Sequence, residues 1–152
     1  MRIVLQRVKE AAVSIQGTQR AGIGYGLLGL IGFMSGEESI ARDRVWSKLA
    51  SKIVQLRIFP DPEGKLNLSL PEFGGEILLV PQFTLYADCR KGRRPGFSQA
   101  LEPQAAERLF ALFADEVQNL GCRPQTGVFG ADMDVSLVNW GPVTIILDSA
   151  EF

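Results

Sequence analysis

The residues best suited to chemistry form three short segments, and the first of them follows an apolar run. Gln82, Phe83 and Thr84 present a carboxamide, an aromatic ring and a hydroxyl in succession. A threonine hydroxyl becomes a nucleophile only when a base removes its proton. The chain has no histidine, and no lysine adjoins Thr84 in the sequence. We therefore expect Thr84 to position or hydrogen-bond a substrate; the alternative is a satisfied polar pair with Gln82 in the core.

The second segment is strongly basic. Arg90-Lys91-Gly92-Arg93-Arg94 places four positive charges within five residues. Such a loop can contact the phosphates of RNA without reading the base sequence. The candidate RNA contacts are Lys91, Arg93 and Arg94, and the alternative is a solvated surface loop.

The third segment, Asn139-Trp140-Gly141-Pro142-Val143-Thr144, lies between two apolar runs. Proline cannot donate a hydrogen bond, so Gly141-Pro142 must interrupt a regular strand ladder. A bulge or a tight turn is the plainest interpretation. Asp132 and Asp134 lie just upstream, and we expect them to be solvated rather than to act as an acid–base pair.

Composition removes several classes of site. The chain has 152 residues, no histidine and two cysteines, and its net charge is −1. The missing histidine excludes Ser-His-Asp triads, Cys-His dyads and histidine-ligated metals. We expect no metal, no cofactor, no membrane segment and a cytoplasmic location. The near-neutral charge confines any nucleic-acid contact to a local patch.

The pattern of helices and strands that must position these segments predicts one α+β domain over residues 1–152. We expect helices at about 39–57 and 103–120, a strand at 76–88, and strands at 135–138 and 143–147. In a strand at 76–88, Gln82 and Thr84 would share one face and Phe83 the other. Gly24 to Gly29 matches G-x-G-x-x-G, but it runs into an apolar strand rather than a helix, which favours close packing over dinucleotide binding.

Taken together, these segments resemble the D-aminoacyl-tRNA deacylase family over essentially the whole chain. The matching stretches are Gln6-Arg7-Val8, Gly22 to Gly32, Arg57-Ile58-Phe59, Gly64 to Ser69, Gln82 to Asp88, Lys91 to Pro95 and Val135 to Thr144. The resemblance implies a mixed, largely antiparallel and barrel-like sheet with two main helices.

The resemblance also implies an activity. The family hydrolyses the ester between a D-amino acid and tRNA, and removes glycine mischarged on tRNA-Ala, as a proofreading step in translation. It implies a homodimer with active sites at the subunit interface. There Gln82, Phe83 and Thr84 line a pocket, and a cis Gly141-Pro142 of the other subunit reaches in to reject L-amino acids. Arg7 is implied to hold the Gly-Pro pair in orientation.

Pro81 departs from the pattern, because the family usually has serine before the Gln-Phe-Thr segment. This leaves a deacylase with relaxed chirality as one alternative function. A non-catalytic tRNA-binding module using Lys91, Arg93 and Arg94 is another, and a structural dimer whose Gly-Pro loop serves only packing is a third.

Overall fold

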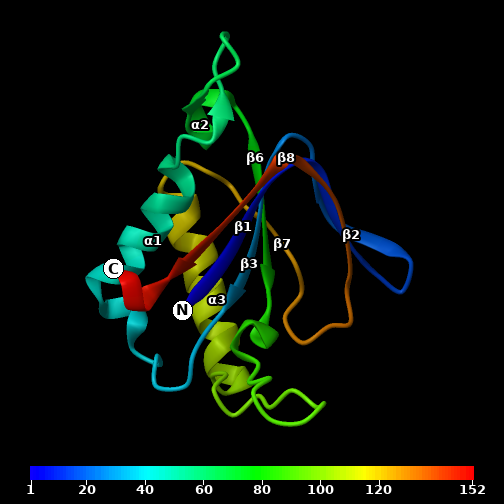
Figure 1. Ribbon diagram of the computed structural model, residues 1–152, viewed down its shortest axis with the longest axis vertical. Helices are drawn as coiled ribbons and strands as arrows, with labels where there is room; N and C mark the ends of the chain where they lie inside the picture. Colours follow the sequence, from blue (N-terminus) through cyan, green and yellow to red (C-terminus); the bar gives the residue numbers. More distant parts are fainter.

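The computed structural model describes residues 1–152 and consists of one mixed sheet with helices packed against it (Figure 1). The strands of the sheet are β1 (Arg2–Ile15), β2 (Thr18–Ile23), β3 (Gly26–Gly32), β6 (Glu76–Pro81), β7 (Gln125–Thr126) and β8 (Asp134–Asp148). A separate ribbon consists of β4 (Phe59–Pro60) and β5 (Leu66–Leu68). The helical elements are η1 (Ile40–Arg42), α1 (Arg44–Gln55), α2 (Leu70–Phe73), η2 (Phe83–Tyr86), α3 (Pro103–Asn119) and η3 (Ser149–Glu151).

Strand β1 is the centre of the sheet. Its first half pairs with β3 and its second half with β2, while β8 runs antiparallel along its other side. Strand β6 joins β3 in parallel, and the short β7 joins β6. The sheet is therefore mixed, largely antiparallel and strongly curled, which confirms the predicted α+β class and barrel-like architecture.

Both faces of this sheet are buried. Helices α1 and α3 cover one face, where Trp46 and Phe113 meet edge to face with ring centroids 5.1 Å apart. Leu27 belongs to that core, whereas its neighbour Leu28 is buried with Val8 in a second cluster. Successive side chains of a strand point to opposite faces. Burial on both sides therefore explains why β3 is an unbroken apolar run.

The glycine-rich start of β3 has a packing role. A Cβ at Gly26 would lie 1.9 Å from the carbonyl oxygen of Glu76, the residue that Gly26 faces in the parallel β3–β6 pair. Only glycine allows this close approach of two backbones. The interpretation of the G-x-G-x-x-G match as a packing feature is confirmed.

The strand predicted at 76–88 is wrong beyond Pro81. Strand β6 ends there, the Gln82 N–H closes the ladder on the Ile31 carbonyl at 2.7 Å, and residues 83–86 form the 3-10 turn η2. Beyond Gln82 the backbone bonds to itself: the Gln82 carbonyl accepts from the Leu85 N–H at 3.3 Å and the Thr84 carbonyl accepts from the Ala87 N–H at 3.0 Å, so the strand gives way to a turn. The expected division of Gln82, Phe83 and Thr84 between two strand faces is wrong for the same reason.

The two strands predicted around Gly141-Pro142 are one continuous strand, β8, with a wide bulge. Gln6 pairs with Thr144 and Val8 with Asn139, so the four residues 140–143 lie opposite Arg7 alone. The Asn139 side chain bridges the bulge: its Oδ1 accepts from the Val143 N–H at 3.0 Å and its Nδ2 donates to the Thr144 hydroxyl at 3.1 Å. The bulge, which the sequence pattern also allowed, interrupts the ladder without ending the strand.

The helix predicted at 39–57 divides into η1 and α1, whereas α3 matches its prediction to within one residue at its C-terminal end. The helix is interrupted at Asp43, whose extended backbone caps α1. No helix in the structure is long and apolar enough to cross a membrane.

Candidate functional site

The segment Gln82-Phe83-Thr84 lies at the carboxyl end of β6, on the surface. Phe83 is 52% exposed and Thr84 is exposed, so they are not a buried polar pair with Gln82 in the core. Gln82 Nε2 donates to the Thr84 hydroxyl oxygen at 2.5 Å. A carboxamide N–H cannot take a proton, and the Thr84 side chain has no other hydrogen-bond partner in the chain. The geometry gives Thr84 an orientation but no base.

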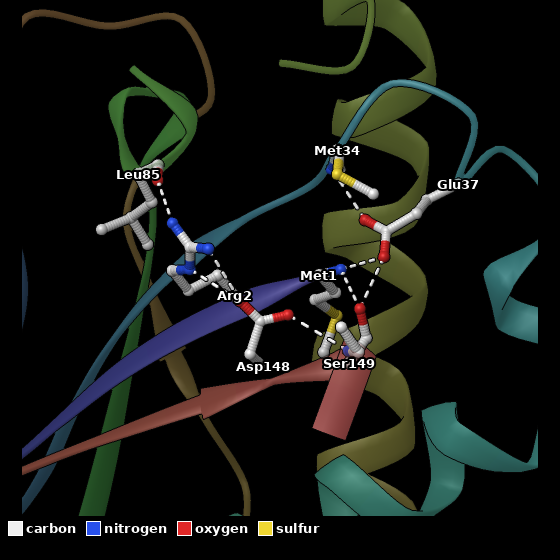
Figure 2. Close-up of polar contacts among 8 residues, drawn as sticks. Met1, Arg2, Met34, Glu37, Leu85, Asp148 and Ser149 are labelled. Carbon is white, nitrogen blue, oxygen red and sulfur yellow. Dashed lines mark hydrogen bonds and ion pairs between the residues drawn. The ribbon is translucent and has the colours of Figure 1, made fainter. Parts of the chain in front are cut away.

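Arg2 fixes the position of η2. Figure 2 shows its guanidinium between two partners: Nη1 donates to the Leu85 carbonyl at 2.9 Å, and Nε donates to Asp148 at 2.9 Å. The same guanidinium lies over the Tyr86 ring, 4.9 Å from its centroid. Burial opposes ionisation of Asp148, but hydrogen bonds from Ala150 and Arg2 outweigh it and lower the pKa of that carboxyl. The turn is thus tied to both β1 and β8.

A second set of contacts in Figure 2 closes the two ends of the chain on each other. The buried Met1 ammonium group pairs with Glu37 and donates to the Ser149 hydroxyl at 2.5 Å. Burial lowers the pKa of this amine, and Glu37 partly opposes the shift. The ends of β1 and β8 are therefore held in register beside η2.

The basic loop is attached to η2. Asp88 and Gly96 exchange two backbone hydrogen bonds at the base of the loop, and the Phe97 ring packs on Phe83 with centroids 4.9 Å apart. Hydrogen bonds from Arg90 lower the pKa of Asp88 to about 2. The remaining three cations, Lys91, Arg93 and Arg94, are exposed and make no ion pair. The structure therefore brings the candidate RNA contacts next to the Gln82-Phe83-Thr84 segment.

A cavity of about 440 Å³ opens beside Gln82 and Phe83. Its other walls come from Val80, Pro81, Leu101, Pro103, the segment from Phe129 to Met133, and Val135. Most of this lining is apolar, and Asp132 is the one carboxylate in it. Sequence reasoning named only Asp132 of this segment, as a solvated residue, and missed the part that Phe129 to Met133 take in the cavity wall; Asp132 is exposed, as expected.

The Gly141-Pro142 pair protrudes from the β8 bulge, and its peptide bond is cis. Both residues are exposed, and Gly141 has φ +131°. A Cβ at Gly141 would lie 2.8 Å from Arg7 Nη2 and 2.9 Å from Val143 Cγ2. Because φ is positive and there is no space for a side chain, glycine is required here.

Arg7 lies beneath the pair and is only 6% exposed. Its Nε donates to the Trp140 carbonyl at 2.9 Å, and its Nη1 donates to the Ile58 carbonyl at 2.6 Å. Burial lowers the pKa of Arg7. A buried guanidinium with two fixed acceptors holds the backbone just before Gly141 in one position.

An aromatic cluster that sequence reasoning missed supports the bulge from behind. The Trp140 ring packs edge to face on Tyr25 at 5.1 Å and lies 5.9 Å from Phe73, while the Arg7 guanidinium lies over it at 4.4 Å. Tyr25 and Phe73 precede sheet strands far apart in the sequence, so no local pattern could have linked them to Trp140.

The two halves of the candidate site do not meet within one chain. Leu85 of η2 contacts Arg2, whereas the backbone beside Gly141 contacts Arg7. Those two arginines are five positions apart on strand β1, which is about 16 Å. Gln82, Phe83, Thr84 and the basic loop form one exposed group. The exposed Gly141 and Pro142 form the other, and the buried Arg7 holds the backbone just before them.

The fold and its relatives define an ester hydrolase. Residues 4–148 match the sequence model of a family described as D-Tyr-tRNA(Tyr) deacylase. A D-aminoacyl-tRNA deacylase of Solidesulfovibrio magneticus is 58% identical, with 99% of this chain and 97% of that protein covered. One of Nitratidesulfovibrio vulgaris is 51% identical over 99% of this chain and 94% of that protein.

Solved structures share the fold of this chain. A structure named c-Myc DNA Unwinding Element Binding Protein has a TM-score of 0.88 at 35% identity, covering 97% of this chain and 98% of the other. A probable eukaryotic D-amino acid tRNA deacylase has the same fold, with a TM-score of 0.78 at 21% identity, over 96% and 97% of the two chains. The chain belongs to the D-Tyr-tRNA(Tyr) deacylase family, as its motifs predict.

Proposed function

We propose that this protein hydrolyses the ester bond of D-aminoacyl-tRNA, and of glycyl-tRNA mischarged on tRNA-Ala, as a proofreading step in translation. The observation that carries the proposal is the division of the site into two exposed groups, whose anchoring residues Arg2 and Arg7 lie about 16 Å apart along β1. Neither group is a complete site alone. Two copies of the chain can supply both groups to each of two pockets. A tRNA substrate also implies a cytoplasmic location.

The second copy has a surface to occupy. Strand β8 pairs only with β1, so its outer edge is open along 15 residues. Exposed apolar side chains lie on it, with Val138 44% and Ile146 62% exposed. Native proteins rarely leave so long an edge uncovered, and a two-fold dimer covers the same edge on both copies. In that dimer, Gly141-Pro142 of one protomer reaches the Gln82-Phe83-Thr84 segment of its partner.

The reaction at this site needs little chemistry from side chains. An aminoacyl ester is an activated acyl group, so a positioned water and a stabilised oxyanion suffice. Hydrogen bonding in η2 begins with the Leu85 N–H, so the N–H groups of Phe83 and Thr84 are free to face a developing oxyanion. The terminal ribose 2′-hydroxyl of the tRNA assists the reaction. Thr84, oriented by Gln82 and lacking a base, positions the substrate.

Rejection of L-amino acids comes from backbone atoms. The Gly141-Pro142 segment presents backbone carbonyl groups, and Arg7 holds the Trp140 carbonyl just before it, so the wall does not depend on a side-chain rotamer. A side chain of L configuration would meet this wall, whereas one of D configuration would lie in the cavity beside Phe83. Glycine has no side chain to exclude and is hydrolysed as well.

Pro81 is the feature that favours the runner-up, a deacylase with relaxed chirality. It lines the cavity and supplies no hydroxyl at the place where the family usually has serine. The presence of Phe83 and of Val143-Thr144, as in the D-specific pattern, favours strict D-selectivity.

The deciding experiment compares hydrolysis of D-Tyr-tRNA, L-Tyr-tRNA and Gly-tRNA at limiting enzyme. We expect the D-tyrosyl and glycyl esters to be lost and the L-tyrosyl ester to persist. Hydrolysis of the L ester as well would establish relaxed chirality, and Pro81→Ser would be the first reversion to make. Binding of tRNA with no hydrolysis would refute the enzyme and support a tRNA-binding module. If changing Gly141 or Pro142 left hydrolysis of all three esters unchanged, a purely structural loop would be supported.

A further inference from the structure

Helix α1 carries an unusual charge distribution. Its twelve residues include three cations, Arg44, Lys48 and Lys52, and no acidic residue. The face of the helix that includes Leu49 and Ile53 is buried in the core. The three cations are exposed and line a groove with Ser47 and Ser51.

The three cations form a straight row. They follow one another at intervals of four residues, which places neighbours about 6 Å apart along one side of the helix. Like charges at this spacing destabilise a helix. Arg44 adds to the effect, since a cation in the first turn opposes the positive end of the helix dipole. The row therefore weakens the fold that carries it.

Nothing in the protomer neutralises the row. The four ion pairs of the chain are Met1–Glu37, Arg2–Asp148, Lys65–Glu63 and Arg90–Asp88. Asp43, the N-cap residue next to Arg44, forms no ion pair with it. Three aligned positive charges without counter-charges suit a linear polyanion better than a single anion.

The row leads toward the Gly141-Pro142 segment. Its groove ends at Arg57, which is held by the Asn67 carbonyl at 2.6 Å. The next residue, Ile58, accepts from Arg7, and Arg7 in turn donates to the carbonyl just before Gly141. From Arg44 to Lys52 the row extends about 12 Å. A strand that leaves the Gly141-Pro142 segment past Arg57 would therefore meet the three cations in succession.

We propose that α1 is a phosphate-binding track for the acceptor stem of tRNA, separate from the basic loop at Arg90–Arg94. The inference rests on the proposed function, because the ester at the 3′ end fixes where the RNA begins. Lysine is a flexible point charge, and the groove has one apolar side chain, Leu56, and no aromatic ring on which a base could stack. The track therefore holds the backbone and reads no sequence.

The test is a salt titration of tRNA binding. The variant Arg44→Gln/Lys48→Gln/Lys52→Gln removes the row, and Arg20→Gln/Arg123→Gln removes two exposed cations elsewhere as a control. We expect the negative slope of log K against log salt to become less steep by about 2 to 3 for the row variant and to stay unchanged for the control. The same loss is expected with an acceptor-stem minihelix. The melting temperature of the row variant should equal or exceed that of the wild type, because repulsion is relieved.

Kinetics separates this inference from the proposed function. On D-Tyr-tRNA the row variant should show a raised KM with kcat retained, since the track binds substrate and transition state equally. An unchanged salt slope, or a loss seen with full-length tRNA but not with the minihelix, would overturn the acceptor-stem track. The track would also be overturned if the row variant lost binding to anionic lipid vesicles while its binding to tRNA stayed unchanged. If the wild type fails to hydrolyse D-Tyr-tRNA, the proposed function fails, while the salt slopes still decide the track.

Discussion

At the scale of the residue, the site depends on groups that hydrogen bonds hold in one orientation. The Thr84 hydroxyl is oriented by Gln82, the backbone before Gly141 is held by Arg7, and Leu85 is held by Arg2. None of these contacts provides a base. The residues therefore supply positions, and the chemistry must come from backbone groups, water and the substrate.

Thr84→Ala decides whether the hydroxyl is a nucleophile. We expect single-turnover hydrolysis of D-Tyr-tRNA to fall by no more than about tenfold, because loss of a true acid–base or nucleophilic group costs at least 100-fold. Rapid-quench measurement with saturating enzyme checks this. A complete loss, with the fold and tRNA binding intact, would make Thr84 the nucleophile.

Gly141→Ala tests the role of the Gly141-Pro142 segment, the wall that rejects L-amino acids. The added Cβ would lie 2.8 Å from Arg7 Nη2, so the guanidinium must leave one of its acceptors. We expect kcat/KM for D-Tyr-tRNA to fall by about 100-fold, the scale of a misplacement near 1 Å. Unfolding free energy should fall by about 1–3 kcal/mol, the cost of an unsatisfied buried polar group.

The matched control for that variant is Gly17→Ala. Gly17 also has a positive φ, +75°, but an added Cβ meets no atom within 4 Å. It should lose some stability through backbone strain and keep full activity. Equal activity losses in both variants would mean that backbone strain, and not the contact with Arg7, explains the result at Gly141.

Asp148→Asn gives a pH-dependent prediction. The pKa of Asp148 is lower in the fold than its unfolded value near 3.9. Its stabilising effect is therefore present above about pH 4 and is lost as pH falls through the folded pKa. We expect the variant to be less stable by about 0.5–1 kcal/mol at pH 6, as for a partly exposed ion pair, and the difference to shrink as pH falls through the folded pKa. Urea unfolding across this range measures it, with the exposed pair variant Glu63→Gln as a control expected to change little at any pH.

At the scale of the element, two predictions from the sequence failed where a local rule met a long-range pairing. The apolar run predicted as a strand at 76–88 forms one only as far as Pro81, after which the chain bonds locally in the turn η2. The Gly141-Pro142 pair breaks the pattern locally, yet β1 pairs with residues on both sides of it and keeps β8 continuous. Helix α3 was predictable because its apolar periodicity is long and unbroken, and strand β3 because it is a continuous apolar run.

The candidate residues could be predicted from the sequence, but the residues that hold them in position could not. Gln82, Phe83, Thr84, Gly141 and Pro142 come from contiguous motifs. The residues that hold them, Arg2 for η2 and Tyr25 and Phe73 for Trp140, come from distant parts of the chain. Only the sheet topology brings such residues together, and one sequence without pairing information does not contain it.

The basic loop is an element whose contribution can be measured alone. Lys91→Gln/Arg93→Gln/Arg94→Gln should weaken binding of every tRNA, because phosphate contacts carry no sequence information. The negative slope of log K against log salt should become less steep by about 2 to 3. Anisotropy titrations with several tRNA species check this. A loss confined to one tRNA would mean that the loop reads bases.

At the scale of the whole molecule, the separation of the two exposed groups predicts complementation between variants. Gln82→Ala/Phe83→Ala damages one group, and Gly141→Ala damages the other. A mixed dimer of the two variants has one pocket with both groups intact and one with both damaged. Random exchange makes half of the dimers mixed, so the mixture should recover about one quarter of wild-type activity, provided that the sites are shared across a two-fold interface.

Activity after unfolding and refolding the two variants together measures this recovery, and refolding each variant alone is the control. Recovery requires that Gly141-Pro142 of one protomer serves the Gln82-Phe83-Thr84 segment of its partner. A mixture that is only as active as the average of its components would mean that each chain builds its site alone. The distance of about 16 Å along β1 would then have to be bridged by a rearrangement of η2 or of the β8 bulge within one protomer. Because Arg2 and Arg7 tie both segments to the same strand, such a rearrangement would break at least one partly buried hydrogen bond, and we expect the interface arrangement instead.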